Sequence, residues 1–116
     1  MYTTFAFAKP NKDSKFEKIH IKRNVAGEGD VTFALKYCGV CHTDVHYAED
    51  HVGMTKYPCV PGHELAGVVT SIGKGVTKVK VGDKVGVGCL VDSCGKCDMC
   101  DQGDEQFCKN GKTIDF

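Results

Sequence analysis

Four cysteines late in the chain have the type and spacing of metal ligands: Cys94, Cys97, Cys100 and Cys108, in the pattern C-x2-C-x2-C-x7-C. Two intervening residues let a tight turn bring two thiolates to one Zn²⁺ ion at about 2.3 Å, and the longer loop returns the fourth sulfur. Four thiolates fill every coordination position of the ion. We therefore expect a closed, structural zinc site in a loop lobe at about residues 89–110.

The segment between these cysteines has little else to order it. Met99 and Phe107 are its only large apolar side chains, whereas structural zinc supplies roughly 10–16 kcal/mol of apparent binding free energy in small peptides. Two disulfides, an iron–sulfur cluster and four free thiols are the alternatives. The sequence shows no secretory signal, which disfavours disulfides. Ferredoxin-type cysteine runs continue as x3-C-P rather than x7-C.

A second set of candidate ligands, Cys41, His63 and Glu64, comes from two separate segments. These are residues 38–46 (CGVCHTDVH) and 57–64 (YPCVPGHE). A cysteine and a histidine from different segments, with space left for water or substrate, describe an open, catalytic kind of zinc site.

Other cysteines and histidines have plainer structural interpretations. Cys38 ends a predicted strand, and we expect it to be a buried thiol. Taken alone, Asp44 is an N-cap and His46 is a surface residue of a short helix. The remaining predictions are two small core residues and two solvated histidines, namely Cys59, Cys89, His20 and His51.

The elements that must position these residues are mostly short strands. Alternating apolar and polar residues between glycine-containing turns predict strands at 16–21, 31–38, 65–72, 79–81 and 84–87. The strand at 31–38 puts Val31, Phe33, Leu35 and Tyr37 on one half-buried face. A helix is expected at 43–50, capped by its first residues. The predicted fold class is mainly β, with one or two short helices.

Composition excludes several classes of protein. The 116 residues suffice for one domain. Fifteen basic and fifteen acidic residues leave no net charge, and no Lys/Arg run forms a phosphate-tracking stripe, so a nucleic-acid partner is not expected. The apolar stretches are far too short to span a membrane. We expect a cytoplasmic protein.

Four segments in this order carry a family resemblance: 38–46, 57–64, VGDKV at 81–85 and the four-cysteine lobe. In these four segments the chain resembles the medium-chain, zinc-dependent alcohol dehydrogenases, most of all the cinnamyl alcohol dehydrogenase branch. The resemblance implies that 1–116 is the N-terminal part of a GroES-like catalytic domain, a partly open β-barrel with a zinc-binding loop lobe. It also implies an oxidoreductase that interconverts alcohols and aldehydes with NADP or NAD.

The resemblance further implies a ligand set for the catalytic zinc. Cys41 and His63 would be two of its three protein ligands, and Glu64 would stand behind the metal and approach it during exchange. Asp44 would accept a hydrogen bond from the other nitrogen of His63 and so fix its tautomer.

Three further residues receive roles toward the substrate and the cofactor. Thr43 would contact the alcohol through its hydroxyl and start a proton relay, and His46 would end that relay at the solvent. His42 would contact the pyrophosphate of the nicotinamide cofactor. A histidine that titrates near neutrality suits such a proton exit.

The sequence departs from the family in three respects. The third zinc ligand, a cysteine beyond the lobe, has no counterpart before Phe116. No G-x-G-x-x-G segment marks a Rossmann domain. Val52 stands where the family often has a tryptophan that lines the substrate pocket.

From these departures we expect a piece of a dehydrogenase that is inactive alone, exposes barrel edges and self-associates. The alternative is a zinc-stabilised, non-enzymatic binding module, which explains the lobe but not segments 38–46 and 57–64.

Overall fold

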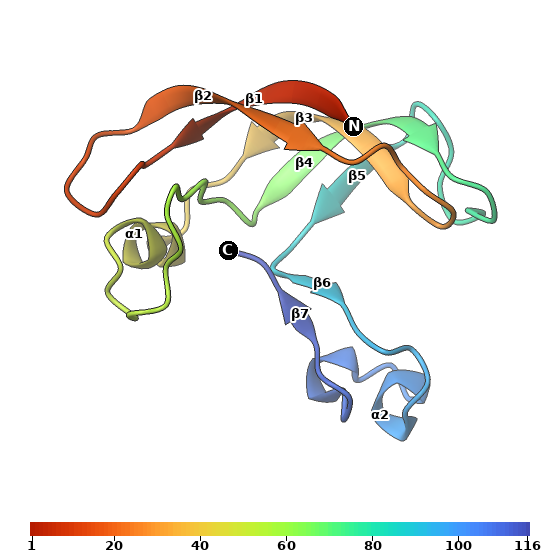
Figure 1. Ribbon diagram of the computed structural model, residues 1–116. Coiled ribbons are helices and arrows are strands. Elements are labelled where there is room, and N and C mark those ends of the chain that lie inside the picture. The colour runs from red at the N-terminus through yellow and green to blue at the C-terminus, as the bar shows by residue number, and fades with distance from the viewer.

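The computed structural model describes residues 1–116, and it is an open assembly of three small antiparallel sheets (Figure 1). The sheets are β1-β2, β3-β4-β5 and β6-β7. The mainly β class and the short helices are as predicted from the sequence. The bounds are β1 Tyr2–Ala8, β2 Glu17–Arg23, β3 Val31–Cys38, α1 His42–Ala48, β4 Leu65–Ile72, β5 Lys84–Val87, β6 Leu90–Asp92, α2 Asp98–Asp101, the 3-10 turn η1 Glu105–Phe107, and β7 Thr113–Ile114.

The hairpin β1-β2 arches over the rest of the molecule (Figure 1). Its turn is closed by the Ser14 hydroxyl, which accepts the Asn11 N–H at 3.0 Å and donates to Asn11 O at 2.8 Å. The sequence analysis missed β1 because its pattern is inverted: the small Ala8 is buried, while Phe5 and Phe7 point outward. Strand β2 was predicted at 16–21, which begins one residue too early and ends two residues too early.

The central sheet confirms the strands predicted at 31–38, 65–72 and 84–87. The strand predicted at 79–81 is wrong, because these residues enter a tight turn. There the Asp83 side chain accepts the Lys80 backbone N–H at 3.0 Å, and Gly82 N–H donates to Val69 O at 2.8 Å.

The predicted half-buried face of β3 is also wrong. Leu35 is 53% exposed and Tyr37 is 77% exposed. The ladder with β4 shifts register between Thr32 and Phe33 and again between Leu35 and Tyr37. Each register shift moves the following side chains to the opposite face of the sheet. The alternating apolar residues of β3 therefore do not form one continuous buried face.

Helix α1 begins at His42, after its N-cap Cys41, and ends at Ala48, so it starts one residue earlier and ends two residues earlier than the helix predicted at 43–50. Asp44 stabilises this start from the third helical position, where its Oδ2 accepts the Cys41 N–H at 2.8 Å. The helix is tied to β1 by an ion pair of 2.6 Å between Lys9 and Glu49. Lys9 and Cys59 also exchange backbone hydrogen bonds of 2.8 and 2.9 Å, which hold the α1 region beneath the hairpin.

The lobe that carries the four cysteines extends away from the sheets on the two-stranded stem β6-β7 (Figure 1). The sequence analysis expected loop here; the lobe contains α2 and η1, each of one turn. Neither has a buried residue, so a hydrophobic core does not hold the lobe together.

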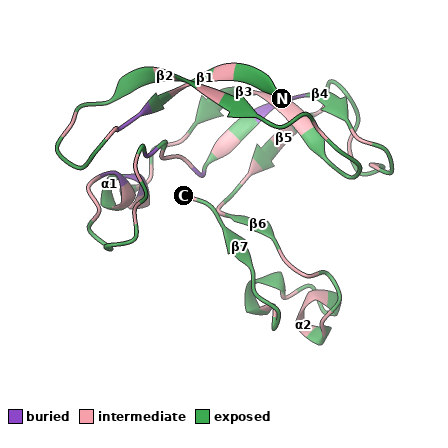
Figure 2. Cartoon of the chain, in the orientation of Figure 1, coloured by how far each residue is buried: buried purple, intermediate pink, exposed green.

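Very little of the molecule is shielded from solvent (Figure 2). Only 8 of 116 residues are buried, so the strands do not enclose a common core. The radius of gyration is 15.8 Å, against about 13 Å for a compact chain of this length. No helix is long and apolar enough to cross a membrane.

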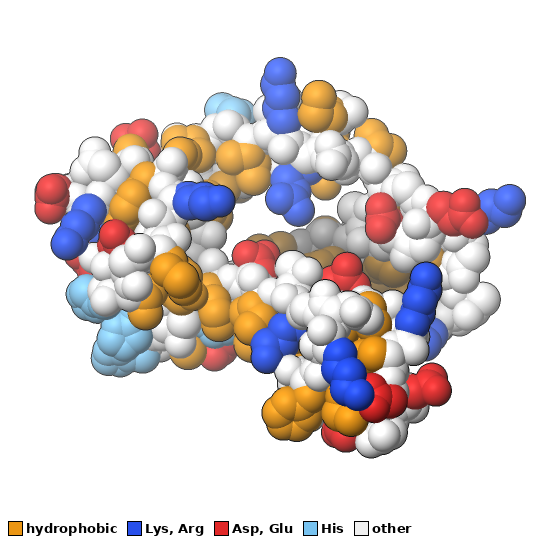
Figure 3. All heavy atoms as spheres, turned by 60° about the horizontal axis from the view of Figure 1, so that its bottom comes forward, with side chains coloured by type: hydrophobic (Ala, Val, Ile, Leu, Met, Phe, Trp, Pro, Cys, Tyr) orange, Lys and Arg blue, Asp and Glu red, His pale blue; other side chains and the backbone are white.

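An open groove separates the β1-β2 hairpin from β3 and β4, and Figure 3 shows the molecule hollowed through its middle. Its volume of about 1270 Å³ exceeds the roughly 300–1,000 Å³ of an ordinary ligand pocket. Apolar side chains of both sheets line it, including Ile21 of β2 and Phe33 and Leu35 of β3. The groove is therefore an unfilled interior of a partly open barrel.

Candidate metal centres

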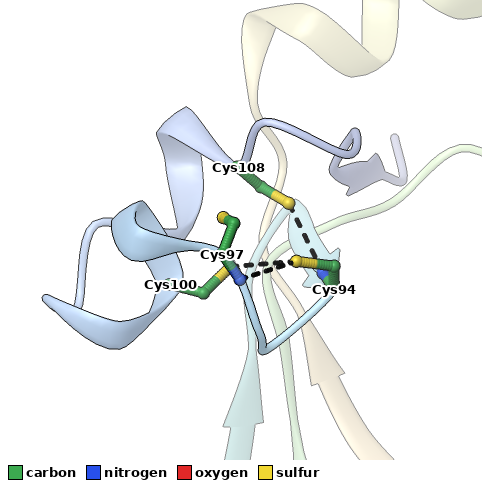
Figure 4. A group of neighbouring side chains, drawn as sticks. All are labelled: Cys94, Cys97, Cys100 and Cys108. Carbon is green, nitrogen blue, oxygen red and sulfur yellow. Dashed lines mark hydrogen bonds between the residues drawn. The ribbon is translucent and has the colours of Figure 1, made fainter.

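The four lobe cysteines converge from three local structures (Figure 4). Cys94 follows β6, Cys97 and Cys100 belong to the cap and body of α2, and Cys108 ends η1. All four sulfur atoms lie within 4.8 Å of one another. Cys94 Sγ and Cys100 Sγ are 3.9 Å apart, and tetrahedral zinc with 2.3 Å bonds sets its sulfurs about 3.8 Å apart. The donor set fits a closed Cys₄ zinc site.

Backbone and amide donors already surround Cys94 Sγ in a way that suits a thiolate. Lys96 N–H and Cys97 N–H each donate to it at 3.3 Å, and Asn110 Nδ2 donates at 3.4 Å. The hydrogen bond from Asn110, followed by those from the two backbone groups, lowers the pKa of Cys94 to about 6.

The neighbouring thiols differ from Cys94. Backbone N–H groups, first that of Cys100, lower the pKa of Cys97. The hydrogen bond to Ser93 favours the Cys100 thiolate, yet burial and the adjacent Cys97 and Cys108 sulfurs outweigh it and raise the pKa of Cys100 to about 11. Without a metal, the four sulfurs thus cannot all be thiolates at neutral pH, and a divalent cation supplies the charge that would make them so.

The structure bears on the alternatives for these cysteines. All eight cysteines are free thiols, and the 3.9 Å between Cys94 and Cys100 sulfurs is far beyond the bond of about 2.05 Å in a disulfide. Free, unrestrained thiols do not agree with four sulfurs gathered around one point.

A second centre forms where the start of α1 meets the residues just before β4. Cys41, His63 and Glu64 bring one ligand atom each to within 4.8 Å of one another. Gly39 and Gly62 make this approach possible. A Cβ on Gly39 would run into the Glu64 carboxylate, and one on Gly62, which has φ 144°, would lie 2.7 Å from Cys38 Sγ.

Asp44 lies directly behind His63. Its Oδ1 is 3.0 Å from His63 Nδ1, both residues are buried, and neither atom meets hydrogen-bond geometry with any other group, so each is the only polar atom available to the other. With Nδ1 facing the carboxylate, Nε2 is the ring nitrogen left for a metal. Burial lowers the pKa of His63, but the hydrogen bond to Cys41 and the charge of Asp44 raise it by more.

Thr43 stands beside the cysteine ligand, with Cys41 Sγ donating to its Oγ1 at 3.6 Å. The backbone N–H of Thr43, and then its hydroxyl, lower the pKa of Cys41. His42 and His46 lie instead on the exposed side of α1, with their ring centroids 4.8 Å apart. The catalytic and cofactor roles of these three residues remain predictions.

Several predictions about single residues need correction. Cys38 is exposed rather than buried, because the open groove leaves the end of β3 uncovered. Cys59 is buried as predicted, and burial raises its pKa, whereas Cys89 is only half-buried. His51 is exposed as expected, but it is not merely solvated, since its Nδ1 lies 2.9 Å from His46 Nδ1.

The sequence analysis also missed an aromatic wall of the second centre. The ring of Phe116 packs edge-on against His63 at 5.1 Å and stacks on Tyr47 at 4.9 Å between centroids. Strand β7 returns the chain to this place (Figure 1). No local pattern in the sequence signals a contact between residues so far apart.

A small β framework with a closed Cys₄ lobe and an open Cys/His/Glu centre defines a zinc-dehydrogenase-like class of protein, and comparison with known proteins agrees. Residues 27–115 match the family described as alcohol dehydrogenase GroES-like domain. The chain belongs to this family, and its fold is the GroES-like, partly open barrel that the resemblance implied.

Individual relatives are similar over nearly the whole chain. Vomilenine reductase of Rauvolfia serpentina is 53% identical over 90% of this chain and 29% of its own length. The structure of a cinnamyl alcohol dehydrogenase of Sorghum bicolor has a TM-score of 0.89 and 41% identity, covering 97% of this chain and 32% of that one. A CAD of Helicobacter pylori complexed with NADP(H) has a TM-score of 0.85 and 40% identity, with coverage of 97% and 32%. The chain spans about a third of the length of these relatives.

Proposed function

We propose that this chain is the zinc-binding N-terminal part of the catalytic domain of an NAD(P)-dependent dehydrogenase that interconverts alcohols and aldehydes. The observation that carries the proposal is the convergence of Cys41, His63 and Glu64 within 4.8 Å, with Asp44 behind the histidine. A thiolate, an imidazole and a carboxylate are ordinary catalytic-zinc donors. Zinc bound there would act as a Lewis acid toward an alcohol or aldehyde oxygen.

The residues around this centre suit the preparation of its ligands. Hydrogen bonds from Thr43 favour the thiolate of Cys41, the form that binds metal. Asp44 holds the proton of His63 on Nδ1, so that Nε2 is available as a ligand. Asp44 also caps α1 through the Cys41 N–H, so one carboxylate positions both the cysteine and the histidine.

Proton transfer is assigned to Thr43 and His46. The Thr43 hydroxyl lies at the centre, 3.6 Å from Cys41 Sγ, and can accept and donate a proton at the same oxygen. His46 is exposed on the same helix, so a proton that it receives can pass to solvent. His42, one residue after the cysteine ligand, is proposed to contact the cofactor pyrophosphate.

The lobe has a different task in this proposal. Cys94, Cys97, Cys100 and Cys108 leave no open coordination position on a zinc ion, so the site stabilises the fold and performs no chemistry.

The exposed groove supports a further proposal, that the chain associates with copies of itself through its apolar strands.

The 116 residues by themselves should show no turnover, because His42 is the only cofactor contact that the resemblance assigns to them. The test of function is therefore a chimera in which residues 1–116 replace the matching segment of the sorghum cinnamyl alcohol dehydrogenase, whose fold is similar over that segment. The chimera should oxidise an alcohol with a nicotinamide cofactor.

Two substitutions sharpen this test. Thr43→Val should lower the turnover of the chimera by roughly 10²–10⁴-fold, the usual size of a general acid–base contribution. Thr43→Ser keeps the hydroxyl and should retain most of the activity. A chimera that folds and binds cofactor but has no activity would favour the alternative, a zinc-stabilised binding module.

A further inference from the structure

Three histidines lie together outside both metal centres. The ring centroids of His42 and His46 are 4.8 Å apart, and those of His46 and His51 are 5.2 Å apart. All three residues are exposed. Histidine side chains form a continuous patch at the left of Figure 3, so solvent has direct access to their ring nitrogens.

The backbone fixes the pairing of His46 and His51. At the end of α1, His51 N–H donates to His46 O at 2.8 Å and Asp50 N–H donates to Tyr47 O at 3.2 Å. Asp50 takes the left-handed conformation, with φ 55°. These are the bonds of a Schellman motif, which sets the third-last helical residue against the second residue beyond the cap. A hydrophobic contact is usual at that place, and here two imidazoles occupy it.

The loop after this motif is anchored as well. Asp50 Oδ1 accepts the Thr55 N–H at 3.0 Å, and the Thr55 hydroxyl donates to Tyr47 O at 2.5 Å. Tyr57 donates to Ala48 O at 2.8 Å. Because the loop is tied back to the helix, His51 does not have to be ordered by a ligand, and this preorganisation reduces the entropic cost of binding.

The spacing of the two nitrogens matches a chelating pair. His46 Nδ1 and His51 Nδ1 are 2.9 Å apart. Two nitrogens bound at 2.0–2.1 Å with a right angle between them are about 2.9 Å apart, whereas a tetrahedral angle separates them by about 3.3 Å. A right angle is the geometry of square-planar or octahedral ions such as Cu²⁺ and Ni²⁺. His42, four residues before His46, lies on the same helical face, but the three rings do not bring their nitrogens to one point as the ligands of the two cysteine centres do, so the chelating pair is His46 and His51.

We propose that His46 and His51 form a surface site for a divalent transition-metal ion that prefers right-angled nitrogen ligands. The ion would replace the hydrogen bond between His46 Nδ1 and His51 Nδ1. Such an ion would hold the ring of His46, the residue to which the proposed function gives the proton exit. Binding itself does not depend on that role and can be measured without any turnover.

The test uses Ni²⁺ as the probe and the zinc-loaded chain, so that the cysteine centres are already filled. Calorimetric titration should detect one Ni²⁺ ion per chain. His51→Asn should weaken its binding by at least about tenfold, because a chelating pair becomes a single ligand. His20→Asn, at an exposed histidine on β2, is the matched control and should leave the affinity unchanged.

A second variant probes the backbone argument. Asp50→Asn tolerates the left-handed conformation and keeps an oxygen that can accept the Thr55 N–H, so it should preserve Ni²⁺ binding although the negative charge is lost. The proposal is overturned if the zinc-loaded chain binds no Ni²⁺, or if His51→Asn and His20→Asn bind it equally well. It is also overturned if Asp50→Asn abolishes binding while circular dichroism stays unchanged, because a carboxylate would then be the ligand.

Discussion

The Asp44 carboxylate serves two partners at once. Its Oδ1 lies 3.0 Å from His63 Nδ1, and its Oδ2 accepts the Cys41 N–H at 2.8 Å. One side chain therefore orients both the cysteine and the histidine of the candidate catalytic centre. The sequence predicted this pairing only through the family resemblance, because Asp44 and His63 are distant in the chain and a lone aspartate at a helix start is an ordinary cap.

Asp44→Asn should weaken zinc binding at this centre by about 10–100-fold. The amide oxygen can still accept the Cys41 N–H, but the amide N–H then faces His63 Nδ1 and favours the tautomer with its proton on Nε2. That tautomer cannot ligate a metal through Nε2. Chelator competition measures the loss, and Asp13→Asn in the exposed β1-β2 turn is the control. An unchanged affinity in Asp44→Asn would contradict the proposed role.

The cysteines of the metal-free lobe should differ in reactivity at pH 7. Cys94 has a pKa of about 6 and is mostly thiolate, whereas Cys100 has a pKa of about 11 and stays a thiol. The lower pKa also makes Cys94 thiolate the weaker nucleophile, but the larger thiolate fraction prevails. Mass spectrometry after brief iodoacetamide treatment should find Cys94 alkylated more than tenfold faster, with the rate falling as pH drops through 6. Equal rates, or faster labelling of Cys100, would count against this assignment.

At the scale of elements, the sequence was informative where periodicity is undisturbed. Strands β3, β4 and β5 were predicted with their observed bounds. The burial of β3 was not predictable, because the register shifts arise in its pairing with β4. Strand β1 was missed because its large aromatic residues point outward. The contact between His46 and His51 was missed because a non-glycine residue, Asp50, adopts the left-handed conformation that reverses the chain.

Gly67 shows how closely β3 and β4 approach each other. A Cβ at this position would run into Ala34 O and lie 2.5 Å from the Phe33 ring. Gly67→Ala should destabilise the fold by about 1–3 kcal/mol through overpacking, measured by urea denaturation. Gly88→Ala is the control, since a Cβ there meets nothing within 4 Å. Equal midpoints for the two variants would refute this packing.

At the scale of the whole molecule, the chain exposes a surface that compact proteins bury. The groove of about 1270 Å³ and the large radius of gyration of 15.8 Å both reflect sheets that do not close on one another. The resemblance predicted a partly open barrel, but composition alone did not, because the chain has an ordinary apolar content of 41%.

This open surface leads to an expected self-association. The mass from light scattering should rise with protein concentration, because association buries the exposed apolar side chains of β1 and β3. Leu35→Glu, which puts a charge on an apolar residue that lines the groove and is 53% exposed, should shift the mass toward the monomer. A wild-type chain that stays monomeric at the highest attainable concentration would contradict the predicted self-association.

The lobe is the part of the molecule where metal and fold depend on each other most directly, since α2 and η1 have no buried residue. Native mass spectrometry of the reduced chain, with and without the double substitution Cys94→Ser and Cys97→Ser, tests that dependence. We predict a zinc ion that survives His63→Ala but is lost from the double variant, with proteolysis then cutting the lobe between Asp92 and Asn110. A reduced wild-type chain that carries no zinc and still resists proteolysis in the lobe would contradict the account.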